Sequence, residues 1–533
     1  KMLPRMTLHG PECVQFNIGT RRFRQNLKQV PQVHDHAPPR TVERGKRRPY
    51  LFLGIVPSMR RKGSLIMSDF SREHVVASLL STHGEVLQRG KPVVISRAPA
   101  RLDVMGGIAD YSGAMVLEGT LAEATICGVQ LRDDQTVRIV SSANDPHGGA
   151  ERDVTVPLNV LFPARTGSPY ARVSSEFPKS SPRHWASYGL GAYTVLMAEH
   201  VVGSFPCGAT IVVHSNVPLG AGVSSSAALE VAVMKALSHA YGFPMAGIPL
   251  ASLCQKVENY VVGAPCGIMD QVTSVLGREG EFLCLKCQPH DVQGFVRLPK
   301  GVRVVGMNSD VKHSVGGERY TSARVGAFMG QRIIQEVGLR EAGVDPTGGY
   351  LANISKADFR KKWARHLPPK MAGAEFLESY HRTNDPVAPV APQTEYMVRS
   401  RAAHPVYEND RVQRFISLMK TATDSGEKAP LIAAGKLMYA SHWSYGQRCG
   451  LGSRETNTLV SLVRQRGVSE GFFGAKITGG GSGGTVAILC RRDTDGALES
   501  IAERYHEISG RSPQLFLRSG PGADQWGVIQ VSF

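Results

Sequence analysis

The sequence predicts an α+β protein with two domains. The chain has 533 residues, which is enough for two or three domains. Strand-like and helix-like runs are mixed within each half, as in α+β folds. A new strand-like run begins just after residue 300. We therefore expect a basic extension over residues 1–66, an N-terminal domain over 67–299 and a C-terminal domain over 300–533.

The N-terminal half shows both hydrophobic periods. Apolar residues at helical spacing predict amphipathic helices, and alternating apolar residues predict half-buried strands. The expected helices are residues 70–89, 187–202, 227–241 and 250–262. The expected strands are residues 92–96, 116–132, 136–141 and 209–213.

The C-terminal half begins with an expected strand at 302–308 and a helix at 316–338. Residues 340–410 form a long insertion rich in Pro, Arg and His, with short helical pieces at 356–366 and 373–381. Further helices are expected at 410–420, 432–444, 454–464 and 498–508, and further strands at 485–489 and 528–533.

The net charge of +17 is concentrated at one end of the chain. Residues 1–65 hold 14 Lys/Arg and 3 Asp/Glu, so they supply +11 of this charge and the other 468 residues only +6. A basic tail without periodicity is usually disordered. We expect a poorly ordered extension without a catalytic role, and an organelle-targeting leader is the alternative. The case for a nucleic-acid binder would rest on this tail alone. We therefore expect no nucleic-acid partner.

Composition also bears on the compartment. The nine cysteines are scattered, and Cys284-x-x-Cys287 has no second pair, so strand cysteines are favoured over zinc ligands. We expect a reducing, cytoplasmic compartment unless the extension is a leader. No apolar run approaches the length of a membrane span, so no membrane partner is expected.

The segment from Pro218 to Glu230 is the most informative in the chain. Its sequence, PLGAGVSSSAALE, places glycines and serines immediately before an expected helix. The first turn of a helix offers unpaired N–H groups and the positive end of the dipole, which together bind phosphate. The sequence therefore predicts a phosphate loop, and a plain turn with a helix N-cap is the alternative.

Three further segments share this glycine-rich character or carry a carboxylate. They are SRAPARLDVMGGIADYSG at 96–113, GAPCGIMDQ at 263–271 and KITGGGSGGTV at 476–486. Taken in their order along the chain, the four segments resemble those of the small-molecule kinases grouped as galactokinase, homoserine kinase, mevalonate kinase and phosphomevalonate kinase. The resemblance covers residues 91–531. It implies an N-terminal domain with a mixed sheet of ribosomal-protein-S5-like topology and a C-terminal domain with a ferredoxin-like antiparallel sheet and helices.

The resemblance implies a catalytic pair and a metal site. Asp270 corresponds to the base that faces the substrate hydroxyl, and Arg101 to the arginine beside the base and the γ-phosphate. Glu258 and Ser226 correspond to the Mg²⁺ ligands, and oxygen ligands suit that ion. Taken alone, Asp270 could be a helix N-cap, Arg101 a surface arginine and Glu258 a solvated helix residue.

The resemblance also implies the residues that contact ATP and sugar. Those expected at ATP and its phosphates are Pro218, Gly220, Ala221, Gly222, Ser224, Ser225, Ser226, Ala227, Trp185, Gly479, Gly480 and Gly481. Those expected at the sugar are Gly107, Ile108, Asp110, Tyr111, Gly267, Asp270 and Tyr320. Taken alone, Tyr111 and Tyr320 would more often be core residues.

One departure from the galactokinase pattern points to the substrate. Galactokinases have Gly-Glu-His-x-Asp-Tyr here, and the Glu and His bind O6 of the sugar, whereas this chain has Gly106-Gly-Ile-Ala-Asp-Tyr111. L-Arabinose has the ring stereochemistry of D-galactose but lacks O6, so a pocket without those polar groups suits it. The insertion resembles that of plant-type kinases that act on L-arabinose.

We therefore expect an enzyme that uses ATP and Mg²⁺ to convert L-arabinose to its 1-phosphate, as a monomer or weak homodimer. A galactokinase with an unusual O6 pocket is the alternative of the same class. A catalytically inactive sensor of sugar and ATP is the alternative of another class, and the presence of Arg101, Ser226, Glu258 and Asp270 argues against it.

Overall fold

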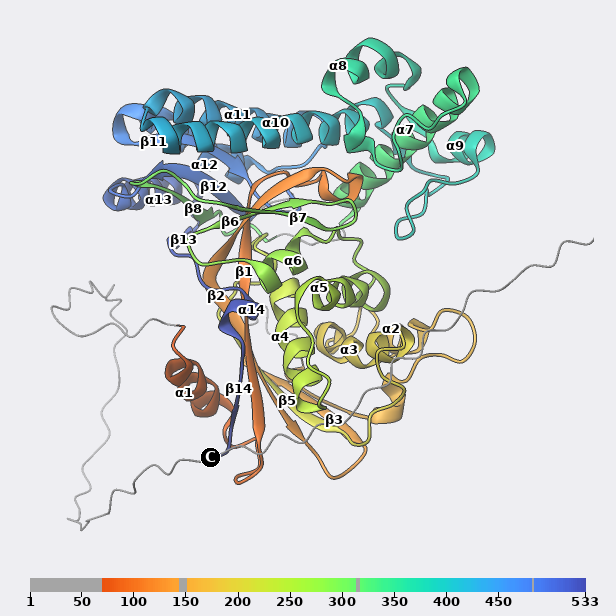
Figure 1. Cartoon of the computed structure of the whole chain (residues 1–533), viewed down its shortest axis with the longest axis vertical. Coiled ribbons are helices and arrows are strands. Elements are labelled where there is room, and N and C mark those ends of the chain that lie inside the picture. The colour runs from red at the N-terminus through yellow and green to blue at the C-terminus, as the bar shows by residue number, and fades with distance from the viewer. Residues whose placement is uncertain (1–69, 143–150, 313–316, 482–483) are drawn as a thin grey trace, which may run out of the picture. The chain divides into compact units, whose positions relative to one another are not determined.

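The computed structural model describes residues 70–142, 151–312, 317–481 and 484–533 (Figure 1). These residues lie in one compact unit, Ile66–Phe533. The expected basic extension at 1–66 lies outside the described residues, so its disorder stays a prediction. Among the described helices, none is both long and apolar enough to cross a membrane.

The first sheet has eight strands within the described residues. Its main path runs β14-β1-β2-β5-β3-β4, with β6 paired to β2 and β7 paired to β6. β3 and β5 run parallel and the other pairs antiparallel, so the expected mixed sheet is confirmed. The strands are β1 (Val93–Met105), β2 (Met115–Leu131), β3 (Thr136–Ser141), β4 (Asp153–Pro157), β5 (Ala209–Ser215), β6 (Phe282–Lys286), β7 (Asp291–Val296) and β14 (Val528–Val531).

Helices cover both faces of this sheet. The α-helices are α1 (Arg72–His83), α2 (Ala171–Glu176), α3 (Ser187–Ala198), α4 (Ser225–Ala240), α5 (Gly247–Lys256), α6 (Met269–Leu276) and α14 (Ala523–Trp526). The shorter turns are the 3₁₀ helices η1 (Asp110–Ser112), η2 (Leu158–Leu161) and η3 (His184–Ala186) and the π-helix η4 (Val257–Val262).

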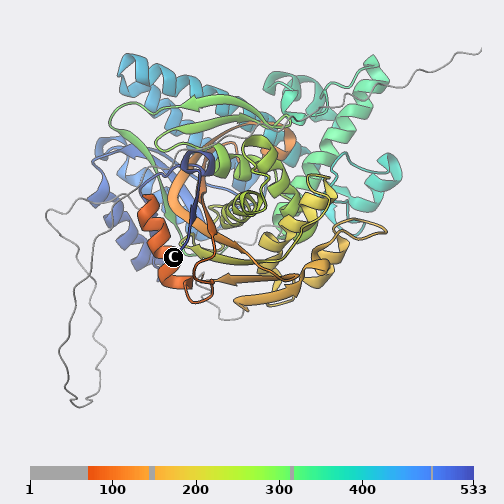
Figure 2. The ribbon, with the colours of Figure 1, turned by 60° about the horizontal axis from the view of Figure 1, so that its bottom comes forward.

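Alternate residues of β1 pack in different layers, because successive strand side chains point to opposite faces. Val94 joins the core cluster that contains residues of α3, α4 and α5. Val93 and Ile95 pack instead with Val75 and Leu79 of α1. Figure 1 shows α1 on one side of the strands and α3 to α5 on the other. The C-terminal strand completes the α1 layer, and Figure 2 shows the C-terminus beside that helix.

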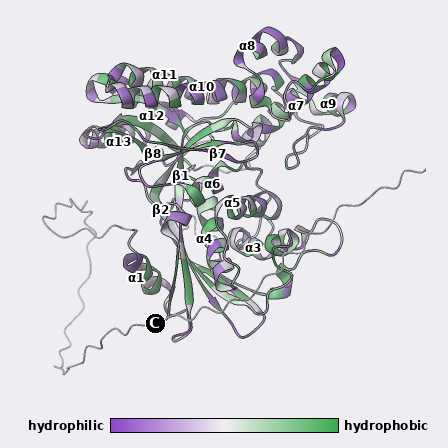
Figure 3. Ribbon diagram, viewed as in Figure 1, coloured by the Kyte–Doolittle hydropathy of each residue, from purple (hydrophilic) through white to green (hydrophobic). Residues whose placement is uncertain are grey.

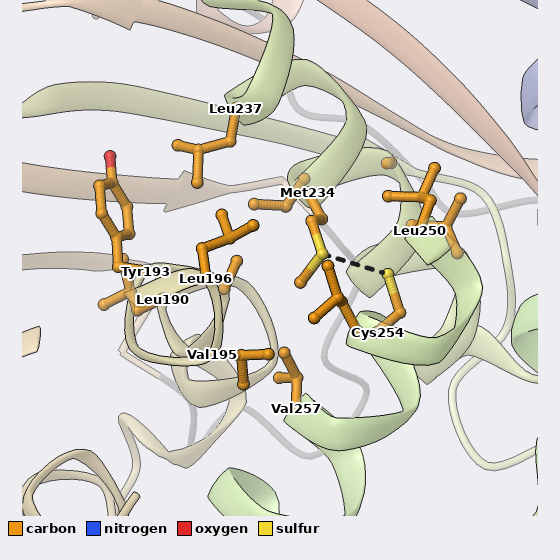
Figure 4. Close-up of a cluster of buried hydrophobic side chains, with 14 of the residues drawn as sticks. Leu190, Tyr193, Val195, Leu196, Met234, Leu237, Leu250, Cys254 and Val257 are labelled. Atoms are coloured by element: carbon orange, nitrogen blue, oxygen red, sulfur yellow. Dashed lines mark hydrogen bonds between the residues drawn. The ribbon is translucent and has the colours of Figure 1, made fainter. Parts of the chain in front are cut away.

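The larger core cluster lies where α3, α4 and α5 meet (Figure 4). Tyr193 and Leu196 of α3 face Leu237 of α4, and Met234 faces Cys254 of α5, whose sulfur lies 3.8 Å from the methionine sulfur. These side chains are at most 1% exposed, so this packing fixes α4 and with it the phosphate loop at its N-terminus.

The second sheet is antiparallel, with strand order β11-β12-β8-β13. Helices α12 and α13 pack on one face, through a cluster that includes Val305 of β8 and Ile488 of β12. Helices α10 and α11 pack on the other face, through a cluster that includes Leu489 of β12. The expected antiparallel sheet with helices is therefore confirmed. The elements are β8 (Val302–Asn308), β11 (Phe472–Ile477), β12 (Thr485–Arg491), β13 (Gln514–Phe516), α10 (Val398–Ser425), α11 (Lys428–Gln447), α12 (Arg454–Arg466), η8 (Val468–Glu470) and α13 (Asp495–Ser509).

The insertion forms a third packed layer around the long helix α7 (Glu318–Ala342) and the start of α10. Its short elements are η5 (Leu351–Asn353), α8 (Lys356–Asp358), the π-helix η6 (Phe359–Trp363), η7 (Ala364–His366), β9 (Met371–Ala372), α9 (Gly373–Tyr380) and β10 (Glu395–Tyr396). Figure 3 shows hydrophilic residues prominent on these outer helices, whereas the strands of the first sheet are largely hydrophobic.

Several described elements differ from the sequence prediction, and three of them show why. The helix expected at 410–420 spans Val398–Ser425, because it tolerates Pro405 in its interior. The strand expected at 92–96 continues to Met105, because every residue of β1 is buried and the chain shows no simple alternation. Helix α6 was not predicted, since its eight residues follow a Gly-Pro turn. The predicted domain boundaries remain predictions.

Candidate active site

A cavity of about 480 Å³ lies beside the phosphate loop, within the size range of small-molecule sites. Fourteen of the residues expected from the sequence line it. They are Arg101, Ile108, Asp110, Trp185, Gly220, Gly222, Ser224, Ser225, Ser226, Gly267, Asp270, Tyr320 and, from the second glycine-rich loop, Gly479 and Gly480. The segments that the sequence separates by up to 379 positions are thus brought to one place.

The phosphate loop has the conformation that its glycines allow. Gly220 and Gly222 have φ values of 72° and 75°, a left-handed region that favours glycine. Ser224 is also left-handed, with φ 59°, and directly precedes α4. The N-terminus of this 16-residue helix therefore opens toward the cavity through Ser225 and Ser226.

The second glycine-rich loop packs directly on the first. A side chain at Gly479 would place its Cβ 2.6 Å from the Gly222 carbonyl oxygen, and one at Gly484 would place it 2.4 Å from that of Ala221. The Thr485 hydroxyl also donates to the Ala221 carbonyl at 2.8 Å. These glycines allow the two loops to touch, so Gly479 both lines the cavity and supports the phosphate loop.

Asp270 and Arg101 form a bidentate pair. Nε and Nη2 of Arg101 donate to the two carboxylate oxygens of Asp270, each at 2.8 Å. Nη1 donates to the Gly222 carbonyl at 2.9 Å, and the Ser224 hydroxyl donates to Asp270. Burial alone would lower the pKa of Arg101, but the Asp270 and Glu118 carboxylates raise it above its ordinary value. The guanidinium therefore stays charged beside a carboxylate at the mouth of the phosphate loop.

Asp110 also lines the cavity, at the start of η1. It is 5% exposed, and burial together with the charge of Asp270 raises its pKa to about 6. Gly267 permits its approach, because a Cβ there would lie 1.7 Å from the Asp110 carboxylate. Tyr111, beside it, lies edge-on to Tyr320, with ring centroids 6.2 Å apart. The Asp110 and Asp270 carboxylates, which both line the cavity, can accept hydrogen bonds from a polyhydroxyl ligand.

Glu258 lies in a buried carboxylate pair next to the phosphate loop. The side-chain amide of Gln271 donates to Glu258 at 2.7 Å and to Glu230 of α4 at 3.1 Å. Burial and Asp270 raise the pKa of Glu258 to about 7, while hydrogen bonds from Ser226 and Cys266 lower it. Oε1 of Glu230 is buried without a hydrogen-bond partner among the described residues.

This donor set fits a divalent cation with oxygen ligands. Glu258 and Ser226 supply a carboxylate and a hydroxyl, and a cation there would offset the repulsion between Glu258, Glu230 and Asp270. The described residues contain no cluster of three or more His, Cys, Asp or Glu with ligand spacing. Mg²⁺ does not require one, since it usually keeps several waters and phosphate oxygens as ligands.

Several expected residues lie near the cavity without lining it. Pro218 and Ala221 face a separate surface hollow behind the phosphate loop, and Ala227 is buried in α4. Gly481 allows Tyr445 to approach, since a Cβ there would lie 2.6 Å from the Tyr445 ring. Residues 482–483 of this loop and 313–316 before Tyr320 lie outside the described residues.

Gly107 also lies outside the lining, for a reason that the sequence did not reveal. A Cβ at this position would lie 1.8 Å from the Tyr445 hydroxyl and 2.2 Å from an Asp103 carboxylate oxygen. That same oxygen accepts from Lys476 at 2.8 Å and from Tyr445 at 3.0 Å. Asp103, Lys476 and Tyr445 are all fully buried, so they fill the space that a residue 107 side chain would need.

The far end of the cavity includes residues that the sequence reasoning missed. Lys179, His184, Tyr188, Leu229 and Val262 line it together with Trp185. The Trp185 indole donates to the Glu151 carbonyl at 2.6 Å, which fixes its ring. An apolar pocket with an aromatic wall suits a nucleotide base. No motif marked these residues, because they come from separate elements with ordinary composition, among them α3, α4 and η4.

Comparison with known proteins agrees with this arrangement. The family description "GHMP kinases N terminal domain" matches residues 188–278, and "GHMP kinases C terminal" matches residues 428–507. The chain carries both domains of the GHMP kinases. The first domain contains the phosphate loop, Glu258 and Asp270, and the second contains Tyr445.

Two relatives make the comparison more specific. An L-arabinokinase of Arabidopsis thaliana is 38% identical over 519 residues, covering 87% of this chain. The chain spans 49% of that relative's length. A galactokinase of Lactococcus lactis, solved with galactose, aligns with a TM-score of 0.65 and 21% identity, over 86% of this chain and all of the other. The galactokinase comparison supports the fold.

Proposed function

We propose that the chain is an ATP- and Mg²⁺-dependent sugar kinase that phosphorylates the anomeric hydroxyl of L-arabinose. The observation that carries the proposal is the Asp270–Arg101 pair, held beside the phosphate loop in a cavity that also exposes Asp110 and Ile108. The L-arabinokinase relative supports the same substrate.

The chemistry follows from the positions of these groups. Asp270 accepts the proton of the anomeric hydroxyl as its oxygen forms a bond to the γ-phosphorus of ATP. The bond from that phosphorus to the β,γ-bridging oxygen breaks, and ADP leaves. Arg101 orients Asp270 through the bidentate pair, and stabilises the charge that develops on the transferred phosphoryl group. Ser226 and Glu258 would hold Mg²⁺, which when bound neutralises charge on the ATP phosphates.

Sugar preference follows from Ile108. This residue is 2% exposed, lines the cavity and packs in an apolar cluster with Tyr320, Tyr445 and Leu451. Its backbone is left-handed, with φ 60°, which is costly for a β-branched side chain and shows that the surroundings hold it firmly. A galactose O6 beside this cluster would lose its water partners and gain none, whereas L-arabinose has only a ring methylene there.

An ADP-release assay over L-arabinose, D-galactose, D-fucose, D-galacturonate and mevalonate tests the proposal. We expect L-arabinose to have a kcat/KM about tenfold or more above D-galactose, because an unpaired buried hydroxyl costs about 1–3 kcal/mol. D-Fucose carries a methyl group in place of the hydroxymethyl. A better rate for D-fucose than for D-galactose would identify the hydroxyl as the cause, and equal poor rates would identify its bulk.

The Asp270→Asn variant is the control for chemistry. It keeps the shape of the side chain but cannot accept the proton, so kcat should fall by about 10²–10⁴ while ADP affinity changes little. An Asn variant that keeps more than about a tenth of the wild-type kcat would exclude Asp270 as the base. Equal or better kcat/KM for D-galactose would favour a galactokinase. Binding of sugar and ATP without turnover would favour the inactive sensor.

A further inference from the structure

The insertion carries a buried carboxylate that reaches the active-site wall. Asp385 lies between α9 and β10, and its side chain is fully buried. Its oxygens accept from Nε of Arg324 at 2.6 Å and from Nη2 at 2.8 Å. Asn384 beside it donates to Gln335 at 2.7 Å, which gives this loop a second attachment to α7. Figure 1 shows α7 and α9 side by side.

Arg324 carries this contact to the catalytic turn. Its remaining amino group, Nη1, donates to the Cys266 carbonyl at 3.2 Å. Cys266 precedes Gly267, which touches the Asp110 carboxylate, and the turn ends at Asp270. Arg324 is only 4% exposed, and three of its N–H donors bond to groups of the protein. The bidentate pair with Asp385 fixes the direction of the guanidinium.

The same guanidinium supports the tyrosine wall, defined here as Tyr111 and Tyr320. It lies 5.1 Å from the ring centroid of Tyr111, within cation–π range. Tyr320 lies one turn before Arg324 on α7 and lines the cavity. One buried cation therefore contacts the catalytic turn and the tyrosine wall, and the insertion supplies its counter-ion.

We propose that Asp385 is a positioning residue that holds Arg324, and through it the Cys266–Asp270 turn and the tyrosine wall, so that the insertion sets sugar affinity. The expected change in the KM for sugar rests on the proposed sugar-kinase function. The positioning of the turn and the tyrosine wall rests only on contacts within the protein. The ATP end of the cavity, at Lys179 and Trp185, lies on other elements. Loss of the pair should therefore affect sugar binding and spare nucleotide binding.

The kinetic test compares Asp385→Asn and Arg324→Lys with a matched control, Glu395→Gln. Glu395 lies in the same insertion and pairs with Lys370, but both side chains are more than half exposed. We expect the first two variants to raise the KM for sugar about tenfold or more, because small displacements of positioning groups are costly, and to leave the KM for ATP within about twofold. Glu395→Gln should match the wild type in both. Equal rises in both KM values, or none, would overturn the proposal.

A second variant guards against loss of folding. Removing one partner of a buried ion pair leaves an uncompensated charge, whereas apolar replacement of both is often tolerated. The double variant Arg324→Met, Asp385→Leu should fold and still lose the hydrogen bond to Cys266. A folded double variant with the wild-type sugar KM would contradict the proposal.

Amide hydrogen exchange tests the structural consequence in the full chain without any ligand. Asp385→Asn should speed exchange in residues 263–268 and 110–113, and Glu395→Gln should not. Faster exchange confined to residues 383–387 would show that Asp385 acts only locally. This readout needs no turnover, so it tests the positioning role even if the proposed function is wrong. The sugar panel with the wild-type protein tests the proposed function separately.

Discussion

At the residue scale, short-range motifs pointed to the candidate site residues but not to the residues that hold them in place. Asp270 and Arg101 were expected from their segments, and the structure places them in a bidentate pair. Tyr445 and Asp103, which decide what can stand at position 107, are 342 positions apart in the sequence. A single sequence cannot show that two such side chains share one hydrogen bond, so the reason for Gly107 was not predictable.

Gly107 gives a prediction about stability. Gly107→Ala should destabilise the fold by about 1–3 kcal/mol, because its Cβ must displace a fully buried tyrosine and one end of a buried ion pair. Urea or guanidinium denaturation gives the change in free energy of unfolding.

The matched control is Gly496→Ala on α13, where a Cβ would meet no atom within 4 Å. This control should leave stability unchanged or slightly raised, because alanine favours helices. Equal stability of both variants would mean that the Tyr445–Asp103–Lys476 cluster can move aside. It would also allow a glutamate at this position, as galactokinases have, which the present geometry excludes.

At the element scale, long periodic segments were predicted well and elements stabilised by tertiary contacts were not. The strand expected at 302–308 is β8, and the helix expected at 454–464 is α12 with two further residues. In contrast, β1 and α10 extend far beyond their predicted bounds. The extra residues of β1 include the buried charged side chains of Arg101 and Asp103, and those of α10 include an internal proline. Local sequence patterns count such residues against a strand or a helix, but tertiary packing overrides this preference.

The side chains of Ser226 and Glu258, which come from two different elements, give a prediction about metal dependence. Ser226 is in the first turn of α4, and Glu258 is in the π-helix η4. Ser226→Ala and Glu258→Gln should each raise the Mg²⁺ concentration for half-maximal turnover by about tenfold or more, because each loses an oxygen ligand or a group that orients one. The measurement is turnover against free Mg²⁺ at saturating ATP.

Glu470→Gln is the control, since Glu470 lies on η8 and is 46% exposed in a surface ion pair. Its Mg²⁺ titration should match the wild type. Unchanged titrations in Ser226→Ala and Glu258→Gln together would place the metal elsewhere. An effect of Glu258→Gln alone would leave Ser226 as a phosphate contact.

At the scale of the whole molecule, the α+β class and the two kinds of sheet were predictable, but the closure of the chain was not. β14 joins the first sheet beside β1, with Val531 opposite Val93. The last residues therefore complete the sheet that carries Arg101, although they follow the second domain in sequence. This long-range antiparallel pair has no local signature, because any short β-branched run could form it.

The last prediction concerns the basic extension. The residues that line the cavity lie between Arg101 and Gly480, all within the unit Ile66–Phe533. The extension supplies +11 of the net charge of +17 but has no periodic apolar face with which to pack. Deleting residues 1–65 should therefore leave kcat and both KM values within about twofold of the full chain, since a segment without an apolar face contributes little to packing. Circular dichroism and the melting temperature are the folding controls. A truncated protein with unchanged folding but a raised KM for ATP would contradict this prediction. If, in addition, low salt lowered the KM for ATP of the full chain but not that of the truncated chain, the extension would be shown to draw the anionic nucleotide toward the site.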